Sequence, residues 1–147
     1  VYPDLYAEDT AFEMGKGAIV RDGGDVTVIA CGIMVHKAME AAEMLAEKGV
    51  SVRVVDMYSV KPIDRELIVK CAKETGALVT AEEHNICGGL GSAVAEVLAQ
   101  EGCAVPTEFV GIQDVFTESG PYKELLAKYG LDAKGVMAGI EKVIGRK

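Results

Sequence analysis

The chain has 147 residues, enough for one domain that buries a core without disulfides or metals. Half of its residues are hydrophobic and 26% are charged, a balance typical of globular proteins and not of disordered ones. The formal net charge of −8 argues against nucleic acid and anionic membranes as partners, and no apolar run approaches the length of a bilayer span.

The four cysteines, Cys31, Cys71, Cys87 and Cys103, are scattered along the chain. None forms a CxxC pair, and no histidine stands at a metal-ligand spacing from them. This pattern predicts reduced thiols and argues against a disulfide framework or a zinc site. We therefore expect a cytoplasmic protein that binds no metal.

The first segment, from Val1 to Gly17, is polar, rich in tyrosine and acid, and without a regular hydrophobic period. Such a segment before the first strand is typical of a linker. We interpret residues 1–17 as a linker from an upstream domain and residues 18–147 as one domain. The chain is accordingly expected to be a fragment of a longer polypeptide.

From residue 18 onward, short β-rich runs alternate with segments of helical period. Strands are expected at Ala18–Val20, Val26–Cys31, Val50–Val55, Ala77–Ala81 and Val105–Val110. Helices are expected at Met34–Lys48, between Asp64 and Gly76, at Leu90–Glu101, near Tyr122–Tyr129 and at Ala133–Ile144. Asp64 and Asp132 are suited to cap helix N-termini, and Gly49 and Gly76 to end helices in the left-handed conformation.

Strands that alternate with helices predict right-handed βαβ crossovers and a mostly parallel sheet. Only the short turn Asp22–Asp25 separates the first strand from the second, so the first strand should pair antiparallel, as an edge or hairpin strand. The predicted fold is a three-layer α/β/α domain with a five-stranded, mostly parallel sheet and one antiparallel edge strand.

The segment from Glu82 to Ser92 is the natural place for a functional site, because open α/β sheets bind ligands beyond the carboxyl ends of their strands. It is expected to form a turn between the strand that ends at Ala81 and the helix that begins at Leu90. Its candidate interface or turn residues are Glu82, Glu83, His84, Gly88, Gly89, Gly91 and Ser92.

Anion binding by this turn would use the free amides at the start of the following helix. Its glycine spacing, however, matches neither GxGxxG nor GxxxxGK[ST], and no basic residue follows it. The nearest cations in sequence are Lys73 and Lys123, whereas two glutamates directly precede the turn. These features argue against a phosphate site.

Acid–base chemistry by Glu82, Glu83 and His84 is a second interpretation, but no nucleophile motif accompanies them apart from the isolated Cys87. The favoured interpretation is structural. One glutamate would accept hydrogen bonds from the turn amides, while His84 would pack at an interface.

Several blocks of the sequence, in order, resemble one protein family. These blocks are Phe12–Gly17, Gly24–Ala30, Val55–Asp64, Thr80–His84 with Gly88–Ser92, and Val110–Asp114 with Glu118–Gly120 and Leu125–Leu131. Together they resemble the C-terminal domain of transketolase, and most closely the C-terminal polypeptide of split, two-subunit transketolases. Similar domains form the C-terminal part of the β subunit of 2-oxo acid dehydrogenases and of deoxyxylulose phosphate synthase. The chain departs from the family pattern at Cys87 and Thr117.

The resemblance implies a transferase of the pentose phosphate pathway, which moves a two-carbon ketol unit between sugar phosphates with thiamine diphosphate and Mg²⁺. In this family other domains bind the cofactor and metal, through a GDG motif followed by an asparagine. Here only Asp22-Gly23-Gly24-Asp25 is similar, and no asparagine follows at a matching distance. The resemblance therefore implies that this chain contributes no catalytic, cofactor-binding or metal-binding residue.

The partners implied by the resemblance are the upstream thiamine-binding domains or subunit of the same enzyme, with a homodimer in the complete enzyme. The chain would serve as an assembly domain and would be inactive by itself. The alternatives are the equivalent domain of another thiamine-dependent enzyme, or a small α/β domain that binds a regulatory nucleotide or sugar phosphate at the turn from Gly88 to Ser92.

Overall fold

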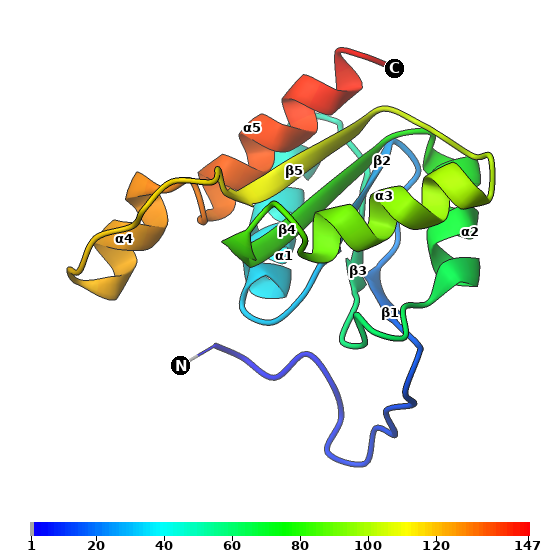
Figure 1. Cartoon of the computed structure of the whole chain (residues 1–147), viewed down its shortest axis with the longest axis horizontal. Helices are drawn as coiled ribbons and strands as arrows, with labels where there is room; N and C mark the ends of the chain where they lie inside the picture. Colours follow the sequence, from blue (N-terminus) through cyan, green and yellow to red (C-terminus); the bar gives the residue numbers. More distant parts are fainter. Residues whose placement is uncertain (1) are drawn as a thin grey trace.

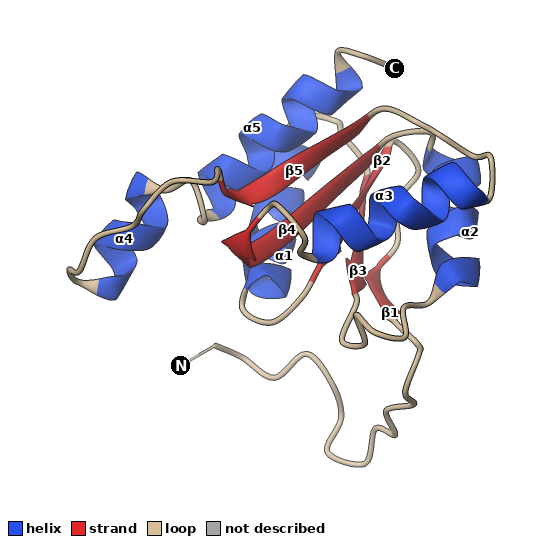
Figure 2. Cartoon of the chain, viewed as in Figure 1, coloured by secondary structure: helices blue, strands red, loops and turns tan. Residues whose placement is uncertain are grey.

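The structure is a computed structural model that describes residues 2–147, in which one five-stranded sheet is flanked by helices (Figures 1 and 2). The strands are β1 (Ala18–Arg21), β2 (Val26–Ala30), β3 (Val52–Asp56), β4 (Leu78–Asn85) and β5 (Thr107–Ile112). The helices are α1 (Met34–Ala46), α2 (Arg65–Thr75), α3 (Leu90–Gln100), α4 (Tyr122–Lys128) and α5 (Ala133–Ile144). The predicted fold class is confirmed.

The strand order is β1-β3-β2-β4-β5, and every pairing is parallel except that of β1 with β3. The expected antiparallel edge strand is therefore confirmed, but the hairpin alternative is wrong because β3 lies between β1 and β2. The connection after β1 wraps around the start of β3. Asp25 and Ser51 exchange hydrogen bonds there, and a Cβ on Gly23 would overlap the Val52 backbone.

Alternate residues of the central strands pack on opposite faces of the sheet, as the period of two requires. Val28, Val54 and Val79 belong to the cluster that α1 and α5 cover. Their neighbours Ile29, Val55 and Leu78 belong to the cluster under α2 and α3. Because both faces are covered by helices, these strands are apolar on both sides, which explains their almost continuous hydrophobic runs.

Local capping residues set several helix boundaries as expected. The Asp64 side chain accepts a hydrogen bond from Leu67 N at the start of α2, and Asp132 does the same for Gly135 N in α5. Gly76 ends α2 in the left-handed conformation, with φ of 68°. Gly49, two residues beyond the end cap of α1, also has a positive φ.

The largest boundary error concerns β4, which continues through Asn85 instead of ending at Ala81. Glu82, Glu83 and His84 are thus strand residues and not part of a turn. The reason is tertiary: β5 runs beside this polar stretch, with Asn85 in register with Ile112, and Ile86 N donates to Ile112 O. The expected start of β5 also moves, from Val105 to Thr107.

The leader at residues 2–17 packs along the carboxyl ends of β2 and β3 without regular secondary structure. Tyr6 Oη donates to Asp56 Oδ2 over 2.8 Å, and the Phe12 ring makes edge contacts with Tyr6 and Tyr58. Tyr2 stacks on His36. The sequence interpretation of this segment as a linker did not anticipate that its aromatic side chains would be fixed to the domain.

Replacement of Tyr6 by phenylalanine is expected to lower the free energy of unfolding by about 1–2 kcal/mol at neutral pH, since the buried Asp56 carboxyl loses a donor. Burial and the bond to Asp56 raise the pKa of Tyr6 well above its usual value. A raised pKa stabilises the fold fully below about pH 10 and loses this effect as pH rises through the folded value. The wild type should therefore lose stability above that pH, and Tyr6→Phe should lose less.

Urea unfolding followed at several pH values measures both effects. Tyr58→Phe is the matched control, because it lies in the same aromatic cluster and no side-chain hydrogen bond of its hydroxyl is found within residues 2–147. Equal losses in the two variants would show that the Tyr6–Asp56 bond contributes nothing.

Candidate functional site

Glu82, a residue of β4, places its carboxylate against the N-terminus of α3 in the protein interior. Its side chain is almost fully buried, and its residue is 2% exposed. Oε2 accepts a hydrogen bond from Leu90 N over 2.8 Å, and Oε1 accepts one from Gly91 N over 2.9 Å. These are amides of the first helical turn, which have no partner within the helix and lie at its positive end. The structure thus places one glutamate on the amides, as the favoured interpretation expects.

The glycines around Glu82 make this arrangement possible. A Cβ on Gly89 would overlap Glu82 Oε2, and one on Gly91 would lie 2.8 Å from Thr80 Oγ1. On β5, a Cβ on Gly111 would lie 2.9 Å from His84 O. Close approach therefore accounts for Gly89 and Gly91, whereas Gly88 is accounted for by its positive φ of 78°.

The remaining polar residues of the segment are also engaged within the fold. Ser92 Oγ accepts from Gly88 N and donates to Ile86 O. Cys87 N donates to Asn85 Oδ1, and the ring of His84 lies 2.7 Å from Asn85 O through Nδ1. His84 Nδ1 also lies 3.6 Å from Glu82 Oε2, but within residues 2–147 no hydrogen bond joins the Cys87 thiol to His84.

Glu83 points away from Glu82, because successive strand residues face opposite sides of the sheet. It is exposed and contacts the first residue of α4. Burial and a hydrogen bond to Glu83 raise the pKa of Tyr122 to about 12. The two adjacent glutamates therefore contact different helices: Glu82 contacts α3 and Glu83 contacts α4.

The structure brings two cations to the glycine segment that sequence spacing did not reveal. Lys61 and Arg65 line a cavity of about 410 Å³ together with Gly88, Gly89 and Ser92. Lys61 lies in the connection between β3 and α2, and Arg65 is the first residue of α2, both more than twenty residues earlier in the chain. Lys73 and Lys123, the nearest cations in sequence, are not among the residues that line this cavity.

This cavity is nevertheless poorly suited to an anion. The amides of Leu90 and Gly91 are already bonded to Glu82, and Arg65 forms an ion pair of 2.7 Å with Glu101. Glu96 adds a further carboxylate to the lining. The helix terminus that would bind a phosphate is filled by the protein's own carboxylate.

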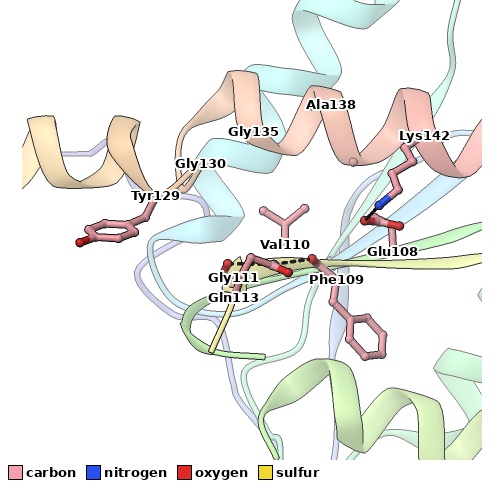
Figure 3. A pocket seen from close by; sticks show the side chains of 11 residues that line it. Glu108, Phe109, Val110, Gly111, Gln113, Tyr129, Gly130, Gly135, Ala138 and Lys142 are labelled. Carbon is pink, nitrogen blue, oxygen red and sulfur yellow. Dashed lines mark hydrogen bonds and ion pairs between the residues drawn. The ribbon is translucent and has the colours of Figure 1, made fainter. Parts of the chain in front are cut away.

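A second cavity, of about 230 Å³, lies between β5 and α5 (Figure 3). Its centre is apolar, with Val110 facing the helix side where Gly135 and Ala138 lie. Lys142 Nζ is paired with Glu108 at 2.6 Å, and the Gln113 amide donates to Phe109 O. Its polar groups thus bond to one another at the edge, and none converges on the centre.

The family model described as the C-terminal domain of transketolase matches residues 15–136. The chain belongs to this family.

Among its relatives, a 6-deoxy-6-sulfo-D-fructose transketolase subunit of a Clostridium species is 45% identical over 141 residues, covering 96% of this chain and 44% of the relative. A 1-deoxy-D-xylulose-5-phosphate synthase of Geobacter sulfurreducens is 47% identical, covering 91% and 21%. A putative transketolase C-terminal section of Methanocaldococcus jannaschii is 47% identical, covering 88% and 40%.

A solved structure described as a split-gene transketolase, inactive β4 tetramer, has a TM-score of 0.93 and 54% identity. The match covers 97% of this chain and 46% of that one. The chain therefore spans less than half the length of these relatives, and the resemblance noted from the sequence is confirmed.

In this transketolase C-terminal domain, the stretch Asp22-Gly23-Gly24-Asp25 partly resembles the family's cofactor motif. The acids that partly resemble the family's cofactor motif are used locally: Asp22 pairs with Arg53, and Asp25 binds Ser51 N. Within residues 2–147, no group of three or more His, Cys, Asp or Glu side chains is placed to hold a metal ion. None of the described helices is long and apolar enough to cross a bilayer.

Proposed function

We propose that this chain is the C-terminal assembly domain of a thiamine-diphosphate-dependent transketolase. The complete enzyme would be cytoplasmic, act in the pentose phosphate pathway and transfer a two-carbon ketol unit between sugar phosphates. The thiamine diphosphate and Mg²⁺ would be bound by other domains. The main support is Glu82, whose carboxylate fills the N-terminus of α3, a helix terminus at the carboxyl edge of the sheet that could otherwise bind an anionic ligand.

The proposed partners are the thiamine-binding domains or subunit of the same enzyme, together with a second copy in a homodimer. Two relatives are described as subunits of transketolases, and both match along most of this chain. The related solved chain is described as an inactive tetramer of β chains. These descriptions favour a split transketolase over a deoxyxylulose phosphate synthase, and they agree with a domain that assembles but does not turn over substrate.

A chimaera tests this proposal. The chain replaces the matching region of the split-gene transketolase β chain, to which it is 54% identical. With the thiamine-binding partner subunit added, the chimaera should transfer ketol units at a rate within about tenfold of the parent, and a β chain that lacks the region should not. The unfused 147-residue chain should show no transfer.

The same chain is also titrated with thiamine diphosphate and Mg²⁺, with sugar phosphates and with nucleotides while its melting temperature is followed. A ligand that binds only the folded state raises that temperature. Saturable stabilisation, or turnover by the unfused chain, would refute the assembly proposal and favour a ligand site in this domain.

A further inference from the structure

The loop after β5 and helix α4 form an arm, residues 113–131, that projects from the body of the domain (Figure 1). The arm is anchored at its base by Leu126 and Leu131, which are buried against the core. Its outer loop is different: Phe116 is fully exposed and Val115 is 53% exposed, and Tyr122 at the start of α4 is half exposed. Large apolar side chains that gather on a projecting element mark interaction surfaces.

Specific contacts hold this loop in shape. Asp114 adopts a positive φ of 54° and accepts a hydrogen bond from Asn85 Nδ2. Glu118 N donates to Tyr129 Oη, and Glu118 pairs with Lys128. Tyr122 at the start of α4 and Glu83 near the end of β4 line the same cavity. Asp114, Glu118 and Lys128 are thus bonded within the fold, while Val115 and Phe116 between them are presented to solvent.

A mostly apolar cavity of about 230 Å³ lies where the arm meets the ends of β4 and β5, and Glu83 and Glu118 are among its lining residues. Ile112, Leu125, Leu126 and Leu131 contribute to its lining, with Thr117 from the loop itself. The aromatic anchor Phe116 is therefore next in sequence to Thr117, a residue that lines this mostly apolar hollow. In a two-fold contact each copy offers the same surface, so an anchor of one copy meets the hollow of the other.

The charge distribution favours a second copy of this chain as the partner. The whole chain carries a net charge of −8, so two copies repel through most of their surfaces. The arm is nearly balanced, with three acids and two lysines: Asp114, Glu118, Glu124, Lys123 and Lys128. Two arms can therefore approach without strong repulsion.

We propose that the arm is a self-association surface, in which Phe116 of each copy inserts beside α4 of the other. Val115 and Tyr122 flank this contact. The inference rests on the proposed assembly function and identifies the surface that performs it.

Sedimentation equilibrium of the 147-residue chain from about 1 to 100 μM tests the proposal. The wild type should self-associate, and Val115→Ser with Phe116→Ser should raise the dissociation constant at least about 30-fold, as expected for an interface anchor. Both side chains are exposed, so the monomer's melting temperature should stay unchanged. Met44→Ser, a comparable change on the surface of α1, should leave association unaltered. If the double variant folds poorly, Phe116→Ser alone should give the same direction of change.

A wild type that stays monomeric over this range would overturn the proposal, as would variants that associate like the wild type. Either result leaves the chimaera assay untouched. An active chimaera with a monomeric chain refutes only the arm's role, whereas an inactive, folded chimaera refutes the proposed function.

Discussion

Glu82→Ala is expected to lower the free energy of unfolding by about 3–5 kcal/mol, measured by urea denaturation. The substitution leaves the amides of Leu90 and Gly91 without acceptors in a buried site. Each buried, unpaired amide costs about 1–3 kcal/mol, and the lost carboxylate also removes a favourable charge from the helix N-terminus. Glu82→Gln should lose less, because its carbonyl oxygen still accepts one of the two bonds.

Glu83→Ala is the matched control, since the neighbouring side chain is exposed and of the same chemical type. Its effect should stay within about 0.5 kcal/mol, the range of most surface substitutions. A loss below about 1 kcal/mol in Glu82→Ala would contradict the structural role of this carboxylate. In the active chimaera, turnover of the Glu82 variants should follow the folded fraction. A much larger fall in turnover would show that the segment takes part in catalysis.

The order and type of the secondary-structure elements could be predicted because their determinants are local. Apolar runs flanked by turn residues mark the strands, and caps such as Asp64, Gly76 and Asp132 are set by neighbouring backbone groups. The position of β1 beside β3 could not be predicted in this way. It depends on pairing between segments about thirty residues apart, and the short connection to β2 suggested a hairpin instead.

The site was predicted less completely than the fold. The continuation of β4 to Asn85 is imposed by β5, a strand that begins more than twenty residues later. One signal could have distinguished the two glutamates: counting in twos from Leu78 places Thr80 and Glu82 on the face that α3 covers. No local signal could have brought Lys61 and Arg65 to the glycine segment, because their proximity is a product of the tertiary fold.

Removal of both acidic partners of Arg53 is expected to destabilise the fold more than removal of Arg53 itself. The Arg53 side chain is 8% exposed, whereas those of Asp22 and Glu74 are 79% and 45% exposed. Arg53 Nε binds Asp22 Oδ1 over 2.9 Å, and Nη1 binds Glu74 Oε2 over 2.5 Å. In Asp22→Ala with Glu74→Ala, a buried guanidinium remains with only the weak acceptor Cys71 Sγ, 3.9 Å away.

An uncompensated buried charge costs about 3–5 kcal/mol, so the double variant should lose about that much. Arg53→Met fills a similar volume and leaves two carboxylates that water can solvate, so its loss should be about 1–2 kcal/mol. Urea unfolding at neutral pH measures the difference between the two variants. The reverse order would mean that the pairs themselves supply net stability. That result would contradict the inference that the acidic partners matter mainly because they compensate the buried charge of the Arg53 guanidinium.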